Sequence, residues 1–403
     1  MWEKNVDINE VKELRTRTLV YFGVGAIQKI NDIAKDLKSK GIDKVIVMSG
    51  RNAYKATGAW DVVEKALKDN EIGYINYDKV TPNPTTDHVN EATKAAYDFG
   101  AKAVIAIGGG SPTDAGKSVA ILLKYKDKTA EELIEGQFEV TEAVPIVSIN
   151  LTHGTGTETN RFAVVTNLAK NFKPVIAYDC IYPTYAIDDP QLMTKLSPKQ
   201  TRFVSVDAVN HVVEAATSKC ASPYSITLAK EVVELVAKYL PKALENPEDL
   251  EARYFLAYAA TMAGVAFDNG LLHYTHALEH PLSGVKPELA HGLGLAMLLP
   301  AVVKTIYAEK SYILAEVLAP VVEGLTGNPD EAEKAAKGVE QWLKSVGVPE
   351  KLEDEGFTEE DVEKLVKLTF ETPSLGLLLS VAPCGNSEDV VREIYKSSLK
   401  PMA

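Results

Sequence analysis

The stretch AVIAIGGGSPTD occupies residues 103–114 and joins an apolar run to three consecutive glycines. A short run of apolar, partly β-branched residues is typical of a buried strand in a parallel sheet. A helical pattern follows over residues 113–125, so the glycines lie at a strand-to-helix turn. Glycine lets a backbone approach a phosphate closely, and the start of a helix supplies free N–H groups. The turn therefore indicates a pyrophosphate site, with a tight turn that requires positive φ as the plainer interpretation.

Similar apolar runs lie on both sides of this stretch. Residues 44–48 (KVIVM) and 144–149 (VPIVSI) read as further strands, and residues 18–22 (TLVYF) read as an earlier one. Helical patterns at residues 60–70 and 87–99 separate them. Strands that alternate with helices and are apolar throughout are typical of a parallel sheet covered on both faces. We therefore expect an α/β dinucleotide-binding domain over residues 1–190, with a linker at residues 182–190.

The strand signal ends near residue 197. Helical patterns follow at residues 201–218, 225–240, 250–267, 292–308 and 328–346. Glycine and proline residues punctuate these patterns at Pro223, Pro241, Gly270, Pro281 and Pro300. We expect residues 191–403 to form an all-helical metal-binding and catalytic domain.

The composition excludes several classes of protein. The chain has 403 residues and a formal net charge of −13, whereas nucleic-acid binding needs clustered Lys and Arg, so no nucleic-acid partner is expected. Its three cysteines are too few for a disulfide framework or a zinc ribbon, which fits a cytoplasmic location. The apolar stretches fall short of the roughly 20 residues that span a membrane, so we expect no membrane segment and no signal peptide.

Histidine is concentrated in one region, because five of the seven histidines fall between residues 211 and 291. The candidates for a site are Asp207, His211, His273, His276, His280 and His291. The first two are four residues apart on one expected helix, and the next three follow with spacings of three and four along another. Imidazoles and a carboxylate on facing helices form sites for Zn²⁺ or Fe²⁺. A lone helical histidine is more often a capping or surface residue, and spacing alone leaves open which four bind a metal.

These blocks resemble the iron-dependent (group III) alcohol dehydrogenases. The resemblance rests on Asp207-x3-His211-x2-Glu214, His276-x3-His280-Pro281-Leu282 and His291-Gly292. The glycine turn, the loop at residues 154–158 and the segment at residues 82–85 (PNPT) stand in the family's order, and the similarity extends from residue 22 to residue 386. The resemblance implies a dinucleotide-binding domain, an all-helical metal domain and an active site in the cleft between them.

The resemblance also implies roles for individual residues. The metal ligands would be Asp207, His211, His276 and His291, binding Fe²⁺ with Zn²⁺ as the alternative. His280 would act as a proton relay or substrate contact. His273 is an additional histidine, expected on the same helix face, that would serve in proton transfer or pack. The expected cofactor contacts are Gly50, Arg51, Asn52, Asn83, Gly109, Gly110, Ser111, Asp114, Thr152, Thr155 and Lys173. For Phe162, Phe267 and Leu271 we expect core packing, with a place in the pocket wall as the alternative.

The strand at residues 44–48 gives a prediction about the cofactor. NAD-preferring relatives carry an aspartate after this strand, where it accepts a hydrogen bond from the ribose 2′-hydroxyl. Here the sequence is Ser49-Gly50-Arg51-Asn52, which offers a guanidinium to a 2′-phosphate and no carboxylate to repel it. We therefore expect NADP(H) rather than NAD(H). The resemblance further implies a homodimer that interconverts primary alcohols and aldehydes.

Other readings of the sequence stay open. Within the superfamily, the alternatives are a glycerol dehydrogenase-like enzyme with Zn²⁺ and NAD, and a dehydroquinate synthase-like lyase. A metal-dependent hydrolase without a nucleotide is a second class. A P-loop NTPase is a third, because residues 110–118 read G-x5-G-K-S, one residue longer between the glycines than the motif. In the loop after residue 149, the sequence NLTHGTGTE stands where the family commonly has PTTAGTGSE.

Overall fold

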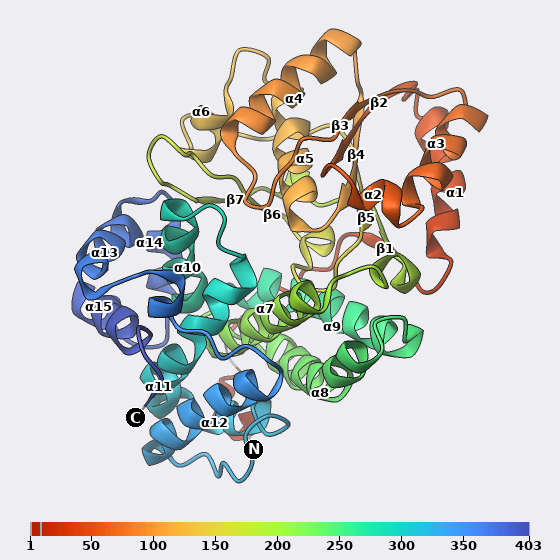
Figure 1. Cartoon of the computed structure of the whole chain (residues 1–403). Coiled ribbons are helices and arrows are strands. Elements are labelled where there is room, and N and C mark those ends of the chain that lie inside the picture. Colours follow the sequence, from red (N-terminus) through yellow and green to blue (C-terminus); the bar gives the residue numbers. More distant parts are fainter. Residues whose placement is uncertain (1, 9, 403) are drawn as a thin grey trace.

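The computed structural model describes residues 2–8 and 10–402 of the chain. The first half forms a sheet with helices on both faces, and the second half forms a helical part that lies against one end of it (Figure 1). The expected combination of an α/β part and an all-helical part is therefore confirmed. The first residues lie against the helical part, where Trp2 is buried near the long helix α11 (His291–Val317).

The main sheet has six parallel strands in the order β1-β8-β5-β4-β2-β3. Their bounds in that order are Leu19–Phe22, Tyr185–Asp188, Ile146–Asn150, Ala103–Gly108, Lys44–Ser49 and Gly73–Tyr77. Successive side chains point to opposite faces, so Val45 and Val47 pack on one side while Ile46 and Met48 pack on the other. The strands β4 and β5 are buried throughout, as expected for a sheet covered on both sides.

Helices cover both faces of the sheet. On one face lie α1 (Ile30–Ser39) and α3 (Ala59–Asp69), and on the other lie α4 (Thr86–Phe99) and α5 (Gly110–Leu122). The shorter helices α2 and α6 span Ala53–Ala56 and Ala130–Ile134. A separate antiparallel pair, β6 (Phe162–Val164) and β7 (Val175–Ala177), packs beside α5 and faces the helical part.

The segment expected to be a linker is part of the sheet, so that prediction is wrong. Residues 185–188 form β8, which lies between β1 and β5 in the sheet. The neighbouring prolines and the two aspartates suggested a loop. However, Asp188 ends the strand, is buried, and accepts a hydrogen bond from Thr261 Oγ1 at 3.1 Å. A strand that ends in a partnered acid lacks the continuous apolar pattern that identified its neighbours.

The helical part is built around α7, α8, α9 and α11. The bounds from α7 to α15 are Pro198–Thr217, Pro223–Glu245, Leu250–Gly270, Tyr274–Val285, His291–Val317, Ala332–Ser345, Val362–Glu371, Leu375–Ser380 and Glu388–Ser397. Pro241, Pro281 and Pro300 lie inside helices, and α8 continues past Pro241, where the expected helix ended. Packing of the surrounding apolar side chains stabilises these helices despite the missing backbone hydrogen bond.

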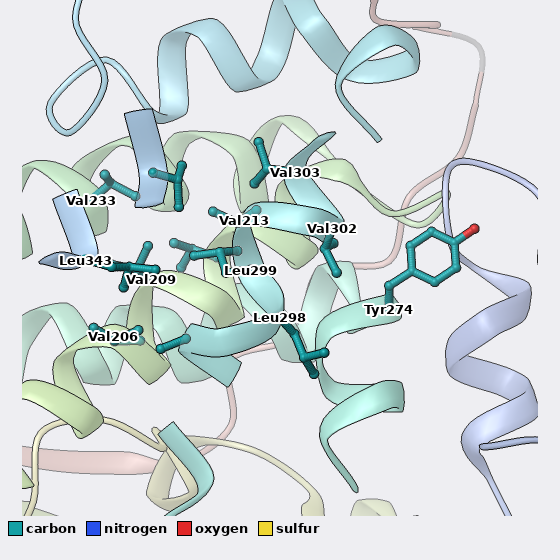
Figure 2. Close-up of a cluster of buried hydrophobic side chains, with 14 of the residues drawn as sticks. Val206, Val209, Val213, Val233, Tyr274, Leu298, Leu299, Val302, Val303 and Leu343 are labelled. Carbon is teal, nitrogen blue, oxygen red and sulfur yellow. The ribbon is translucent and has the colours of Figure 1, made fainter. Parts of the chain in front are cut away.

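The core of the helical part surrounds α11. Figure 2 shows Leu299 of this helix close to Val209 and Val213 of α7, with Leu298 and Val302 on the side of the helix nearer to Tyr274. By length and composition α11 is apolar enough to cross a membrane, but most of its apolar window is buried inside the protein. Such burial is what the central helix of a folded helical domain shows.

The order of the strands locates a crevice. The connection from β2 leads outward to β3, the chain then crosses back to β4, and later strands are added on the opposite side. In open parallel sheets ligands bind where the connections diverge, at the carboxyl ends of the strands. Here that point lies between the ends of β2 and β4, where the glycine turn begins, and this edge of the sheet faces the helical part (Figure 1).

Candidate active site

One cavity of about 770 Å³ lies between the carboxyl ends of the strands and the helices α7, α9, α10 and α11. It is lined by most of the expected site residues: Gly50, Asn83, Gly109, Gly110, Ser111, Asp114, Thr152, Thr155, Lys173, Asp207, His211, His276, His280 and His291. Three expected residues, Arg51, Asn52 and His273, do not line it. The expected cofactor side and the expected metal side therefore face the same space.

Three of the four expected metal ligands converge. Asp207 lies on α7, His276 on α10, and His291 is the first residue of α11. Their ligand atoms all lie within 4.8 Å of one another, and Asp207 Oδ1 is 3.7 Å from His276 Nε2. Two ligands about 2.1 Å from a tetrahedral ion stand about 3.4 Å apart. The spacing is therefore close to that of two ligands of one ion.

His211, the fourth expected ligand, lies beside this group. Its Nε2 is 3.4 Å from Asp207 Oδ1, one helical turn away on α7. Its ring stacks between His276 and Phe267, at centroid distances of 4.7 and 4.5 Å. It is not part of the tight group of three, so its role as a ligand stays a prediction.

The residues present fit a divalent cation. Asp207 Oδ1 and His276 Nε2 are buried and have no hydrogen-bond partner among the described residues. Unpartnered buried polar atoms are costly and are rare in native proteins unless something else pairs with them. A carboxylate and imidazole nitrogens are donors that suit Fe²⁺ and Zn²⁺ alike. An ion between these atoms would satisfy both of them.

Buried carboxylates orient two of the imidazoles. Glu214 Oε2 contacts His276 Nδ1, and Glu279 Oε2 lies 2.5 Å from His291 Nδ1. Each carboxylate holds a proton on Nδ1, which leaves the lone pair of Nε2 free to bind a metal. In both cases the imidazole is arranged as a metal-binding histidine.

The charges around the group favour an ionised Asp207. Burial would raise its pKa, but His211, His276 and His291 outweigh burial and lower the pKa of Asp207 to about 2. Burial would likewise lower the pKa of His276, yet the Glu214 and Asp207 carboxylates raise it to about 9. The raised pKa favours a protonated His276 when no metal is bound, and metal binding would displace this proton.

His280 and His273 differ sharply in position. His280 lines the cavity, and its buried Nδ1 has no hydrogen-bond partner among the described residues. His273 precedes α10 and caps it by accepting a hydrogen bond from the Tyr274 N–H at 2.7 Å, while its Nε2 lies 2.9 Å from Thr217 Oγ1. The expectation that His273 shares one helix face with His276 and His280 is therefore wrong. The reason is the bend of 106° between α9 and α10, which excludes His273 from the helix.

The glycine turn has no room for side chains. A Cβ on Gly109 would come within 2.8 Å of the Thr152 side chain, and one on Gly110 within 2.7 Å of Thr155. Helix α5 begins at Gly110, three residues earlier than expected, so the glycine backbone itself forms the helix start at the cavity. This arrangement exposes backbone N–H groups to an anionic ligand.

The second glycine loop serves mainly to join the two parts. A Cβ on Gly264 of α9 would overlap the carbonyl oxygen of Gly156, so these backbones are in direct contact. Nearby, the buried guanidinium of Arg253 donates to His153 Nε2 at 2.8 Å. Thr155 and Thr157 of the same loop line the cavity. The loop therefore positions a cavity wall and fixes it to the helical part.

The position of Lys117 argues against a P-loop. Its Nζ is fully buried and donates to oxygens of Thr157, Asn160 and Phe162 at 2.7 to 3.5 Å. A P-loop lysine must reach a phosphate, whereas this one fixes the loop after β5. The Asp114 carboxylate accepts hydrogen bonds from Thr157 Oγ1 and the Val164 N–H, so it holds the same region. Its expected contact with a cofactor stays a prediction.

Two expected cofactor contacts connect the parts of the protein. Asn83 donates to the carbonyl oxygens of Pro287 and Leu289, just before His291. Lys173 Nζ lies 3.1 Å from Glu279 Oε2 and is almost completely buried. Arg51, in contrast, is exposed to solvent at the end of β2.

Several important residues were not predicted from the sequence. Glu214 was noted only as part of a motif, and Glu279 and Ser283 were not considered. Helical spacing could have indicated them, because Glu214 is three residues after His211, and Glu279 and Ser283 are three and seven residues after His276. Residues at these spacings share a helix face with the histidines.

Comparisons with known proteins agree with this geometry. A family model described as iron-containing alcohol dehydrogenase matches residues 18–190, and the model of the C-terminal region of the same family matches residues 202–399. The long-chain primary alcohol dehydrogenase of Thermoanaerobacter ethanolicus is 59% identical over 398 residues, which cover 99% of this chain and 100% of that protein.

Two further relatives extend the comparison. The NAD-dependent methanol dehydrogenase of Bacillus methanolicus is 33% identical over 353 residues, covering 87% of this chain and 91% of that protein. The solved structure of NADH-dependent butanol dehydrogenase A from Thermotoga maritima has a TM-score of 0.88 at 30% identity, covering 97% of this chain and 99% of that one. The resemblance noted from the histidine blocks is thereby confirmed, and the chain belongs to the iron-containing alcohol dehydrogenase family, as an oxidoreductase acting on alcohols.

Proposed function

We propose that this protein interconverts primary alcohols with an extended apolar chain and the corresponding aldehydes, using one divalent ion and NADP(H). The observation that carries the proposal is the shared cavity, in which the glycine turn faces Asp207, His276 and His291. A cofactor held at the glycine turn and a substrate held at the histidines would occupy adjoining parts of one space. Hydride transfer requires this proximity.

The apolar part of the cavity wall indicates an apolar substrate. Its apolar lining residues are Phe162, Val164, Val175, Phe267, Leu271, Leu272, Leu377, Leu378 and Val381. Burial of each CH₂ group against such a wall contributes about 0.8 kcal/mol. The name of the Thermoanaerobacter relative specifies long-chain primary alcohols, which agrees with this lining.

Asp207, His211, His276 and His291 would hold the ion, which we propose is Fe²⁺, with Zn²⁺ as the alternative. A bound divalent ion supplies Lewis acidity, which lowers the pKa of a substrate hydroxyl group. The nicotinamide supplies the acceptor or donor of the hydride. His280 takes the hydroxyl proton at its unpartnered Nδ1 during oxidation and returns it during aldehyde reduction. The apolar wall excludes water from the reacting groups.

The preference for NADP(H) rests on the turn after β2. Gly50 lines the cavity, and the adjacent Arg51 is exposed and forms no ion pair with an acid within residues 2–8 and 10–402. A guanidinium in this position is free to pair with a 2′-phosphate. The names of two relatives specify NAD or NADH, so the preference is proposed on the residues of this chain.

The proposal is tested by metal analysis combined with a substrate panel. Purified protein, loaded with Fe²⁺ or Zn²⁺, is assayed with aldehydes of two to ten carbons and with NADPH or NADH. We expect one ion per chain, a higher kcat/KM with NADPH, and a kcat/KM that rises with chain length. Arg51→Ala should raise the KM for NADPH several-fold, whereas Lys55→Ala, an exposed basic residue of α2, should leave it unchanged.

Two outcomes would contradict this proposal. Full activity in protein stripped of metal would exclude the proposed role of the ion. Equal kcat/KM with NADH and NADPH, unaffected by Arg51→Ala, would exclude the proposed phosphate contact. The expected homodimer and the cytoplasmic location stay predictions, and analytical ultracentrifugation tests the first of them.

A further inference from the structure

Glu279 is a fully buried carboxylate with three side-chain partners. Its Oε2 lies 2.5 Å from His291 Nδ1 and 3.1 Å from Lys173 Nζ, and its Oε1 accepts a hydrogen bond from Ser283 Oγ. The three partners come from α10, from the start of α11 and from the segment before β7 in the α/β part. Glu279 thus joins an expected metal ligand to a residue of the other part of the protein.

One reading makes Glu279 a metal ligand itself. The ligand atoms of Glu279, His280 and His291 lie within 4.8 Å of one another and could in principle hold a second ion. However, the ammonium group of Lys173 already contacts the carboxylate oxygen that faces His291. A divalent cation there would be repelled by this buried positive charge. The geometry therefore favours a hydrogen-bonding role over a second metal site.

The proton between Glu279 and His291 has a defined position. Lys173 Nζ lies 3.1 Å from Glu279 Oε2 and 3.3 Å from His291 Nδ1, whereas Glu279 Oε2 and His291 Nδ1 are only 2.5 Å apart, a distance that requires a proton between these two atoms. The Lys173 ammonium group keeps the Glu279 carboxylate ionised, so this carboxylate is the acceptor. His291 must then carry its proton on Nδ1, which leaves Nε2 as the atom available to an ion. His276 shows the same arrangement with Glu214.

We propose that Glu279 is a positioning residue for the metal centre, which fixes the tautomer and orientation of His291, and that Lys173 balances its charge. This inference rests on the proposed function, because it requires an ion at Asp207, His276 and His291. Hydrogen-bond partners of metal-binding histidines typically contribute 10–100-fold to metal affinity or activity. Glu279 therefore stabilises the bound ion without touching it.

Replacement of Glu279 should disturb the surrounding structure less than replacement of Glu214. Glu214 also accepts hydrogen bonds from the backbone N–H groups of His273, Thr275 and His276, so its replacement would disturb the start of α10. The contacts of Glu279 given above are all with side chains. Its replacement by the similarly shaped glutamine is therefore expected to alter the charge and the hydrogen bond and to leave the helix intact.

The test measures Co²⁺ binding, which reports on the site without an activity assay. Co²⁺ affinity is measured by competition with a chelator, and the visible absorption of bound Co²⁺ reports its ligand geometry. Glu279→Gln should weaken Co²⁺ binding by about 10- to 100-fold and change the spectrum. The control is Glu340→Gln, which breaks the buried pair of Glu340 and Lys351, at 2.5 Å, outside the cavity, and should leave Co²⁺ affinity unchanged.

A second pair of variants separates orientation from charge. Replacing Glu279 alone leaves the Lys173 ammonium group unpaired, and its repulsion could by itself weaken Co²⁺ binding. The effect of Glu279→Gln is therefore measured again in the Lys173→Met background, where no unpaired charge arises. A loss of at least about 10-fold that persists in this background, together with a changed Co²⁺ spectrum, supports the positioning role, because loss of the negative charge alone would weaken binding without changing the ligand geometry.

The outcomes distinguish this inference from the proposed function. Unchanged affinity and spectrum in Glu279→Gln, or a loss that disappears in the Lys173→Met background, would overturn the positioning role. Two ions per chain, with one lost in Glu279→Gln, would also overturn it and make Glu279 a ligand. The proposed function itself would fail if the unaltered protein bound no Co²⁺, or if the bound Co²⁺ were retained in His276→Ala.

Discussion

At the glycine turn, a Cβ on Gly109 or Gly110 would come within 2.8 Å of Thr152 or Thr155. Across the same cavity, Asp207 and His276 carry buried side-chain atoms that find no hydrogen-bond partner among the described residues. The first region provides space and backbone N–H groups, and the second provides side-chain donors and charge. Substitutions that add atoms should therefore damage the first region, and substitutions that remove atoms should damage the second.

The largest effect is expected for His276→Ala. This change removes a ligand atom and leaves the Glu214 carboxylate buried without its imidazole partner. We expect metal content near zero after dialysis and loss of metal-dependent activity, with cofactor binding retained. Elemental analysis and NADPH fluorescence titration measure these two properties separately. A variant that kept its ion and its rate would show that His276 is not a ligand.

His280→Ala should have the next largest effect and should spare the metal. The side chain lines the cavity, and its Nδ1 has no partner within the described residues, as a proton-transfer group requires. Loss of a general acid–base group typically lowers kcat by roughly 100-fold or more. We expect such a loss with one ion still bound per chain. Unchanged kcat would remove His280 from the proton path, and lost metal would make it a ligand.

Gly109→Ala tests the opposite region of the cavity. The added methyl group would displace Thr152 or shift the backbone of the turn, because little space is available. We expect NADPH to bind roughly 10-fold more weakly, a cost of about 1.4 kcal/mol, with metal content unchanged. Gly376→Ala in α14, where a Cβ has no neighbour within 4 Å, serves as the control. Tight NADPH binding in Gly109→Ala would place the cofactor elsewhere.

Leu271 is the opposite case to the glycine turn, because it carries a side chain where the backbone conformation favours glycine. It keeps a side chain at φ 62° and ψ 166°, a conformation that favours glycine, and it lines the cavity. Leu271→Gly should relieve backbone strain while removing part of the apolar wall. We expect kcat/KM for a ten-carbon aldehyde to fall about 10-fold, with little change for acetaldehyde and no loss of thermal stability. An equal fall for both aldehydes would contradict a wall that contacts the alkyl chain.

The smallest effect concerns stability at the loop that joins the two regions. Burial, together with the Arg253 guanidinium, lowers the pKa of His153 to about 3. The unfolded chain binds a proton at His153 below about pH 6.5 and the folded protein does not, so this group lowers stability as the pH falls. His153→Gln should reduce the loss of stability between pH 7 and pH 5.5 by about 1 kcal/mol, measured by denaturant unfolding. An unchanged pH dependence would show that another group is responsible.

Much of the fold was predictable because its strongest signals are local. The strands β2, β4 and β5 are continuous apolar runs, and each was predicted within two residues of its observed ends. The strand β8 was missed because its last residue is an acid that is paired only in the folded protein. Pro241 did not end its helix, since tertiary packing outweighs local propensity.

The site was predictable in its residue types but not in all its roles. Spacing placed His276 and His280 on one helix, yet it also placed His273 there, because no local signal indicated the bend after Gly270. Glu279 has the spacing of a site residue, but only its contacts with Lys173 and His291 indicate a role. The contact with Lys173 joins residues that are 106 positions apart, which a helical pattern cannot reveal.

X-ray absorption spectroscopy of the protein loaded with Fe²⁺ or Zn²⁺ tests the central claim most directly, namely that Asp207 and imidazoles from α7, α10 and α11 bind one ion. We predict a first shell of nitrogen and oxygen atoms at about 2.0–2.2 Å, with outer-shell scattering from three imidazole rings and no sulfur. In His276→Ala the same signal should be absent. A shell that contained sulfur, or no imidazole contribution, would contradict the proposed metal centre.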